Sequence, residues 1–203
     1  AAQGITPNGY AFTVDDIRSD DVLTAALEKA KREAQRRGLS DRIRFVLADG
    51  MAALDRTVSC VSITGLGGRN IAEILKQGMR RLGKADLVLC AHTDLPVVRR
   101  CLQQLGWMID QELIVFSQGR YYLVWKARPG LQHLTDEELE LGTAALYHQN
   151  SPELLAGYLR WRLDVESAHL RGLRAGAHTD QMKLHDQETL VVKLQQHLGG
   201  VSN

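Results

Sequence analysis

The chain has 203 residues, enough for one substantial domain with an appendage. Its 25 Lys and Arg against 24 Asp and Glu leave a formal net charge of +1, which by itself favours neither a nucleic-acid nor a membrane partner. With 44% hydrophobic and 24% charged residues, and no apolar run near the roughly 18–20 residues that cross a bilayer, the composition excludes disordered, collagen-like and membrane-spanning chains.

The first 130 residues alternate between strand-like and helix-like segments. Apolar, β-prone runs predict strands, while apolar residues at 3.6-residue spacing and capping residues predict helices. We expect strands at 11–17, 43–47, 58–63 and 87–90, and helices at 22–37, 71–82 and 95–105. This alternation implies parallel pairing with right-handed crossovers, hence a wound α/β sheet.

A hairpin follows the last of these helices. Residues 108–116 and 121–126 are strand-like and flank the turn sequence Ser117-Gln118-Gly119-Arg120. Such a hairpin adds one antiparallel strand to the parallel sheet.

After Pro129-Gly130 the pattern is helical only. Thr135 to Glu138 fits a capping box, and Ser151-Pro152 fits a cap followed by a first-turn proline. Two leucine-rich stripes follow, one from Leu155 to Leu173 and one from Leu184 to Leu198, which predict a pair of packed antiparallel helices. We therefore divide the chain into a domain of residues 1–130 and a helical, coiled-coil-like extension of residues 131–203.

Acidic residues follow two of the predicted strands, and in an open parallel sheet ligands bind at the carboxyl ends of the strands. Asp15 and Asp16 end the first strand, where a carboxylate can accept hydrogen bonds from two ribose hydroxyls or can cap a helix. Asp49, before Gly50, can accept from an exocyclic amine such as that of adenine, or can belong to an ordinary turn. Together the acids outline a bound nucleoside.

The sequence Thr64-Gly65-Leu66-Gly67-Gly68 ends another predicted strand. Glycines at such a place allow close approach of a planar ligand, or simply a tight strand-to-helix turn. The sequence does not match a dinucleotide-binding fingerprint, because Asn70 stands where that pattern has its third glycine. Phosphate binding at the start of the following helix remains open.

Histidine, cysteine and basic residues give weaker signals. His92 follows a strand and is either a base or a substrate contact, or an ordinary loop residue near a buried Cys90. Cys60, Cys90 and Cys101 are an odd number without a CxxC pair, so we expect neither a disulfide framework nor a metal site, and a reduced, cytoplasmic setting. Residues 1–133 carry 19 basic and 14 acidic residues, against six and ten in residues 134–203. An RNA-binding basic face is therefore expected around the first helix, where a merely solvated face is the alternative.

Together these segments resemble the bacterial TrmK family, which methylates a D-arm adenine of tRNA at ring nitrogen 1 with S-adenosylmethionine. The resemblance covers most of the chain. Its motifs are Val14 to Arg18, Gly38 to Met51, the glycine turn Ile63 to Gly68, Ile71 to Leu75, Val98 to Gly106 and Gly119 to Tyr122.

The resemblance implies a class I methyltransferase fold, a Rossmann-like seven-stranded sheet whose last two strands form the hairpin. It also implies an in-line methyl transfer to a flipped-out adenine of the position-22 type, with tRNA as partner. Separately, we expect no metal, and a monomer because no long exposed apolar stripe demands a dimer. Cofactor-binding residues would be Asp15, Asp16, Ile17, Asp49, Gly50 and Met51. The catalytic opening would be lined by Thr64, Gly65, Gly67 and Gly68, and tRNA would contact Arg32, Arg36, Arg37, Arg69 and His92.

Three departures from the family pattern keep an alternative open. The glycine-rich first motif and its strand are absent before Ala1, so we expect an N-terminally truncated chain from a longer protein. Cys90-Ala91 stands where the family usually has Gln-Pro, and Leu123 where members tend to have Glu. The alternative is a tRNA- or RNA-binding relative without catalysis; a phosphate or dinucleotide binder ranks last.

Overall fold

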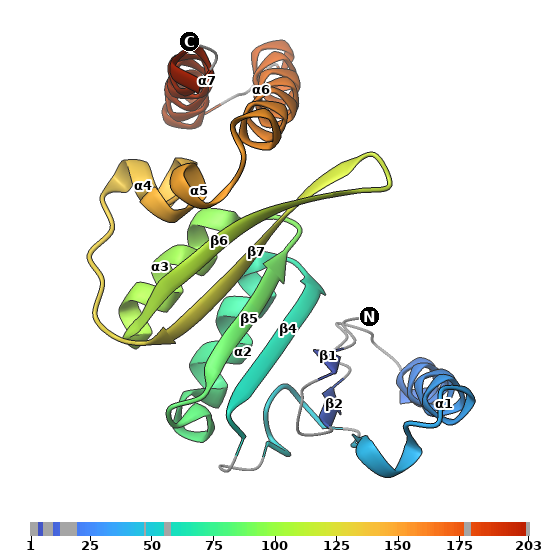
Figure 1. Ribbon diagram of the computed structural model, residues 1–203. Coiled ribbons are helices and arrows are strands. Elements are labelled where there is room, and N and C mark those ends of the chain that lie inside the picture. The colour runs from blue at the N-terminus through green and yellow to red at the C-terminus, as the bar shows by residue number, and fades with distance from the viewer. Residues whose placement is uncertain are drawn as a thin grey trace.

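The computed structural model describes residues 4–5, 10–12, 20–46, 48–54, 58–176 and 180–201. Figure 1 shows a twisted sheet with two helices behind one face and the C-terminal helices stacked at its upper end. The first helix lies on the opposite side of the molecule from those C-terminal helices (Figure 1).

The main sheet has the strand order β4-β5-β7-β6. It consists of β4 (Cys60–Leu66), β5 (Asp86–Ala91), β6 (Trp107–Ser117) and β7 (Arg120–Pro129). β4 and β5 are parallel, whereas β7 runs antiparallel to both β5 and β6. The predicted antiparallel hairpin closing a parallel sheet is therefore confirmed.

Two amphipathic helices cover one face of this sheet. α2 (Gly68–Leu82) buries Ile71, Leu75 and Leu82, at the spacing that the sequence predicts. α3 (Leu95–Leu105) has the predicted bounds and ends at Gly106, which adopts a left-handed conformation and donates to the last carbonyl groups of the helix. The crossover α2 connects β4 to the parallel β5.

The first part of the chain forms a smaller sheet. Its strands are β1 (Gly4–Ile5), β2 (Tyr10–Phe12) and β3 (Arg44–Phe45), in the order β1-β2-β3. α1 (Asp20–Arg36) and the short 3-10 helix η1 (Ser40–Arg42) connect β2 to β3. The strand predicted at 11–17 overlaps β2, and its remaining residues lie outside the described part of the chain. β3 is shorter than the predicted 43–47.

Four helices complete the described chain: α4 (Asp136–Leu141), α5 (Ala144–Gln149), α6 (Pro152–Ala175) and α7 (Gln181–Val201). The capping box at α4 is present, with Thr135 Oγ1 accepting from the Glu138 amide, and Ser151 caps α6. Leu159 and Leu194 are fully buried in the same hydrophobic core as Trp125 of the sheet. None of the described helices is both long and apolar enough to cross a membrane.

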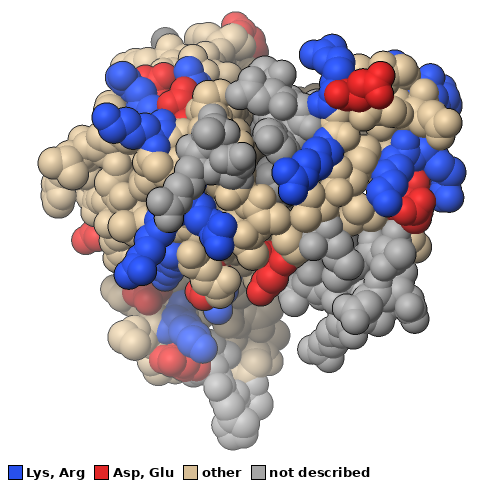
Figure 2. Space-filling model, turned by 90° about the horizontal axis from the view of Figure 1, so that it is seen from below, with Lys and Arg blue, Asp and Glu red and all other residues tan. Residues whose placement is uncertain are grey.

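Charged side chains of both signs lie close together on the face shown in Figure 2. On the side of α1, at the right of that view, basic side chains stand beside acidic ones. The contacts explain this: Lys31 pairs with Glu28, and both Arg36 and Arg37 pair with Glu33. Pairs of this kind at helical spacing of three or four residues each stabilise a helix by only about 0.2–0.5 kcal/mol.

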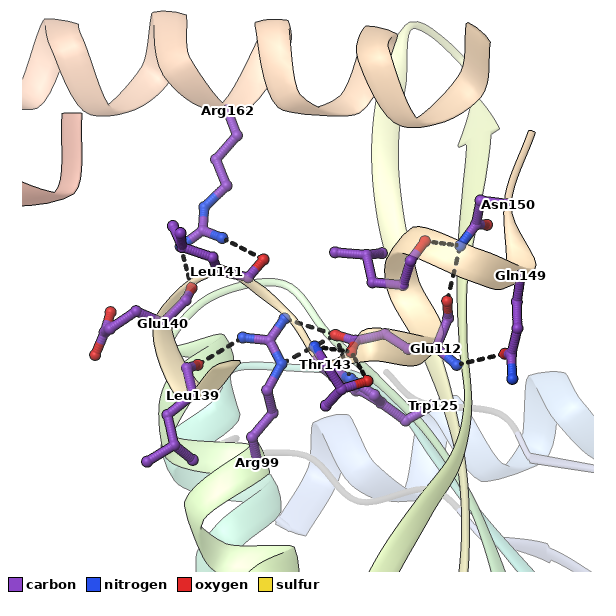
Figure 3. A network of polar contacts seen from close by, with 11 residues as sticks. Arg99, Glu112, Trp125, Leu139, Glu140, Leu141, Thr143, Gln149, Asn150 and Arg162 are labelled. Carbon is purple, nitrogen blue, oxygen red and sulfur yellow. Dashed lines mark hydrogen bonds and ion pairs between the residues drawn. The ribbon is translucent and has the colours of Figure 1, made fainter. Parts of the chain in front are cut away.

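A buried ion pair joins α3 to the hairpin and to the C-terminal helices (Figure 3). Arg99 and Glu112 are both 0% exposed. Glu112 Oε1 accepts from Arg99 Nε at 2.9 Å and Nη2 at 2.6 Å, and from Trp125 Nε1 at 2.9 Å. Glu112 Oε2 accepts from the amide and the hydroxyl of Thr143, each at 2.8 Å. Because both carboxylate oxygens have several donors, the interior tolerates this charge.

Further polar contacts hold the C-terminal helices against the sheet (Figure 3). Arg162 of α6 donates to the carbonyl oxygens of Glu140 and Leu141, at the end of α4, and Arg99 Nη1 donates to that of Leu139. β6 is an edge strand of the sheet. Its Ile114 amide donates to Asn150 Oδ1, and its Glu112 carbonyl accepts from Asn150 Nδ2. The end of α5 thus covers backbone groups of an edge strand.

Replacing Arg99 with leucine is expected to lower the free energy of unfolding by about 3–5 kcal/mol, because it leaves the buried Glu112 carboxylate without its cation. The matched control is Arg174→Leu, which breaks an exposed pair with Glu188 of 2.7 Å and should cost less than about 1 kcal/mol. Urea denaturation of both variants measures the difference. Equal losses in the two variants would contradict a stabilising role of the buried pair.

Candidate functional site

A β-bulge marks the carboxyl end of β4. Thr64 pairs with Cys90 and Leu66 pairs with Ala91, so that Gly65 is an extra residue with no partner in the ladder. Gly65 has φ +80°, which favours glycine because a Cβ atom is strained in this region. The bulge turns the backbone of Gly65 out of the sheet at the edge where parallel α/β sheets bind ligands.

The next two glycines pack against the loop that follows β5. The Gly68 amide donates to the Thr93 carbonyl oxygen at 2.9 Å, and the His92 amide donates to that of Leu66 at 3.0 Å. A Cβ atom on Gly68 would lie 2.4 Å from the Asp94 carbonyl oxygen and 2.6 Å from that of Thr93. Gly68 is therefore required for close packing of two backbones. The turn after β4 and the loop after β5 form one unit.

Asp94 occupies a strained position in this unit. It is a non-glycine residue in the left-handed region, with φ 53° and ψ 42°. Its carboxylate accepts from Arg69 Nε at 3.0 Å and from Thr93 Oγ1 at 2.8 Å. Arg69 has a side chain that is 79% exposed, so Asp94 holds a solvent-facing guanidinium beside the glycine turn. Such a guanidinium can bind phosphate.

His92 faces the hairpin. Its ring lies 5.6 Å from the ring of Tyr122, and both residues line a cavity of about 230 Å³ that also includes Trp161 of α6. Cys90, one position before Ala91, is half-buried, and burial raises the pKa of its thiol. The thiol is thus kept protonated rather than reactive.

Of the predicted cofactor residues, the structure describes Asp49, Gly50 and Met51. Asp15, Asp16 and Ile17 lie outside the described residues. The side chain of Met51 is buried and occupies a notch at Gly78 of α2, where a Cβ atom would lie 2.5 Å from it. Gly78 is ten residues beyond Gly68, about 15 Å along the helix axis. The loop with the exposed Asp49 and the buried Gly50 therefore packs against α2, through Gly50 near Ile74 and through Met51 at Gly78.

The predicted tRNA contacts fall into two places. Arg69 and His92 lie together beside the glycine turn, as described above. Arg32 and Arg36 are exposed on α1, and Arg37 is exposed directly after it. α1 itself lies across the molecule from the C-terminal helices (Figure 1). The hydrogen bonds of Arg36 and Arg37 hold the pKa of Glu33 at about 2, so Glu33 stays ionised and offsets part of the positive charge of α1.

Sequence reasoning assigned no site role to Thr93, Asp94, Tyr122 or Trp161. Asp94 stands directly before Leu95-Pro96, a sequence typical of a helix start, but its strained backbone and its contact with Arg69 depend on the packing of two loops. Leu123, which departs from the family pattern, is buried in the sheet opposite Ile114. Across the described residues, no group of three or more His, Cys, Asp or Glu is arranged to hold a metal ion.

Solved structures of other proteins share this architecture. Sp1610 from Streptococcus pneumoniae, a candidate tRNA (m1A22) methyltransferase, has 25% sequence identity and a TM-score of 0.70, with 88% of this chain and 78% of that chain covered. Its complex with S-adenosyl-L-methionine has 25% identity and a TM-score of 0.68, covering 82% and 75%. TrmK from M. capricolum, solved with S-adenosyl-homocysteine, shares the fold at 20% identity and a TM-score of 0.68, covering 88% and 78%. These likenesses confirm the class I methyltransferase fold. Among curated proteins, none matches the sequence.

The family comparison covers most of the chain. The model of the family TrmK, tRNA (adenine(22)-N(1))-methyltransferase, matches residues 13–191. This range includes the glycine turn, the loop after β5, the hairpin and α6. The chain belongs to the TrmK family of tRNA (adenine(22)-N(1))-methyltransferases.

Proposed function

We propose that this protein transfers a methyl group from S-adenosylmethionine to nitrogen 1 of adenine 22 in tRNA. The observation that carries the proposal is the joined glycine turn and His92–Asp94 loop at the carboxyl edge of the sheet, within the range matched by the family. The family supports tRNA as the substrate class. We further propose that the protein acts as a cytoplasmic monomer, with a methyltransferase domain in residues 1–130 and a tRNA-contacting extension in residues 131–203.

The described residues fit the reacting end of this cofactor. The bulge at Gly65 presents backbone at the carboxyl edge, with the half-buried Thr64 on one side of it and Leu66 on the other. S-adenosylmethionine supplies an electrophilic methyl group on a positively charged sulfonium. Asp15 or Asp16 for the ribose and Asp49 for the adenine amine remain predictions, and so do Ile17, Gly50 and Met51.

The methyl transfer requires no ionisable side chain to move a proton. Nitrogen 1 of adenine carries a lone pair and no proton, so it can attack the methyl group without a general base. The N–C bond forms as the S–C bond breaks, and the positive charge passes from sulfur to the adenine ring. The protein then acts mainly by positioning. Gly65 to Gly68 would face the base, and Arg69, held by Asp94, would bind a phosphate of the tRNA.

Incubation of the protein with unmodified tRNA and methyl-labelled cofactor is expected to label adenine 22 at nitrogen 1. The product is identified by mass spectrometry of nucleosides and by a reverse-transcription stop at that position. A transcript with guanine at position 22 is the control and should stay unlabelled. Absence of label, with an active positive control, would contradict the proposal.

The same samples separate the proposal from the non-catalytic alternative. A non-catalytic relative retains tRNA but shows no cofactor binding by calorimetry. Cofactor binding together with tRNA retention would rule that alternative out.

Asp49→Ala is expected to raise the dissociation constant of S-adenosylmethionine by about 5- to 150-fold, because an accepted hydrogen bond to a buried amine is worth about 1–3 kcal/mol. The control is Asp41→Ala, since Asp41 is an exposed aspartate of η1. Calorimetric titration measures both. An affinity unchanged from that of the wild type would show that Asp49 is only a turn residue.

Gly68→Ala is expected to lower the free energy of unfolding by about 1–3 kcal/mol, because the new methyl group would overlap the Thr93 and Asp94 carbonyl oxygens. The methylation rate should fall with it. Gly172→Ala is the matched control, because Gly172 lies in α6 with no atom within 4 Å of an added Cβ. That control should be neutral or slightly stabilising. Equal behaviour of the two variants in urea denaturation would refute the packing argument.

A further inference from the structure

A cavity of about 230 Å³ lies between three elements that are far apart in the sequence. Its walls come from the loop after β5, from the hairpin and from α6, with His92, Tyr121, Tyr122 and Trp161 among them. The cavity adjoins the glycine turn, because its His92 wall is hydrogen-bonded through the backbone to Leu66. It thus begins where the proposed methyl acceptor would lie and extends away from β4.

The aromatic rings of this cavity form a continuous cluster. The Tyr121 ring lies 5.8 Å from that of Trp161, 6.2 Å from that of Tyr158 and 4.6 Å from that of Phe116. Tyr121 is seated on α6 at Gly157, where a Cβ atom would lie 2.3 Å from its hydroxyl oxygen. The rings are therefore fixed by packing, as a stacking surface requires.

Two side chains of this aromatic cluster are exposed. Phe116 is 55% exposed, and Trp161 is 36% exposed. The other two tryptophans are inside: Trp107 is 5% exposed and Trp125 is 0% exposed. Exposed aromatic rings beside a catalytic edge are typical of surfaces on which unpaired bases stack.

The charge of the cavity suits a nucleotide. The described residues that line it include the cationic Arg120 and no Asp or Glu. Arg120 is exposed in the hairpin turn, where its guanidinium can meet a phosphate at the mouth of the cavity. Arg69 provides a second cation near this loop, where it donates a hydrogen bond to Asp94.

We propose that this cavity holds an unpaired base of the RNA next to the methylated one, stacked on Trp161 and Tyr122, with its phosphate at Arg120. The proposal rests on tRNA being the substrate. The site explains how the C-terminal part of the chain takes part in substrate choice: α6 supplies one wall of a base pocket, and the hairpin and the loop after β5 supply the others.

Tryptophan fluorescence tests the stacking directly, because Trp161 is the one of three tryptophans that a bound base can reach. Unmodified tRNA is expected to quench the emission of the wild type, and a fully paired RNA duplex of equal length is not. Trp161→Phe should keep the affinity for tRNA and lose the quenching. Trp161→Ala and Tyr122→Ala should each weaken tRNA binding by about 5- to 150-fold, with unchanged cofactor affinity.

Arg120→Ala separates the cavity from general charge attraction. Its matched control is Arg171→Ala, an exposed arginine of α6 ten residues beyond Trp161. Arg120→Ala should weaken tRNA binding several-fold more than Arg171→Ala. Because Arg120 lies in an exposed turn, this variant also tests the site without disturbing the aromatic packing; thermal unfolding of each variant confirms that it is folded.

The outcomes distinguish this proposal from the proposed function. Quenching by tRNA that is lost in Trp161→Phe supports the cavity even if no methyl group is transferred. Two results together would overturn it even if adenine 22 is methylated: wild-type tRNA affinity and turnover in folded Trp161→Ala and Arg120→Ala, and no change in the fluorescence of the wild-type protein when tRNA binds. Equal quenching by the duplex would also overturn it.

Discussion

The buried carboxylate of Glu112 joins the hairpin to α3 and to the segment that precedes α5. Glu112 accepts five hydrogen bonds, from α3, from β7 and from the segment between α4 and α5, and it does so without exposure to solvent. A buried charge is tolerated only with partners in place, so the hairpin, α3 and the C-terminal helices must be ordered together. The extension of residues 131–203 is in this sense part of the core that it covers.

The elements that surround Glu112 also carry the aromatic residues of the cavity. The same hairpin that carries Glu112 extends to Tyr121 and Tyr122, and the same α6 that carries Arg162 presents Trp161 to them. The glycine turn is set independently, by its backbone contacts with the loop after β5. The glycine turn and the aromatic cavity are therefore two separately stabilised units that meet at His92.

Local patterns predicted much of the fold because their causes are local. The bounds of α3, the capping box at Thr135 and the hairpin around Gly119 follow from spacing, caps and turn residues. Contacts between distant segments were not predictable in this way. An arginine on a helix is ordinarily exposed, yet the structure buries Arg99 against Glu112. The glycine turn was found from the sequence, but the reason for Gly68, a clash with Thr93 and Asp94, depends on tertiary packing. The position of Asp49 also depends on tertiary packing, because the side chain of Met51 in the same loop packs against Gly78 of α2.

Gly157 has a consequence for how the molecule can vary. A glycine inside a long helix weakens that helix by roughly 0.5–1 kcal/mol relative to alanine. Here the missing methyl group admits the Tyr121 hydroxyl and brings the hairpin against α6. A larger residue at 157 would stabilise the helix alone while pushing the hairpin outward. The stability of α6 alone therefore favours a larger residue at position 157, whereas the contact with the hairpin favours glycine. Glycine at this position sets the distance between the cavity walls that α6 and the hairpin form.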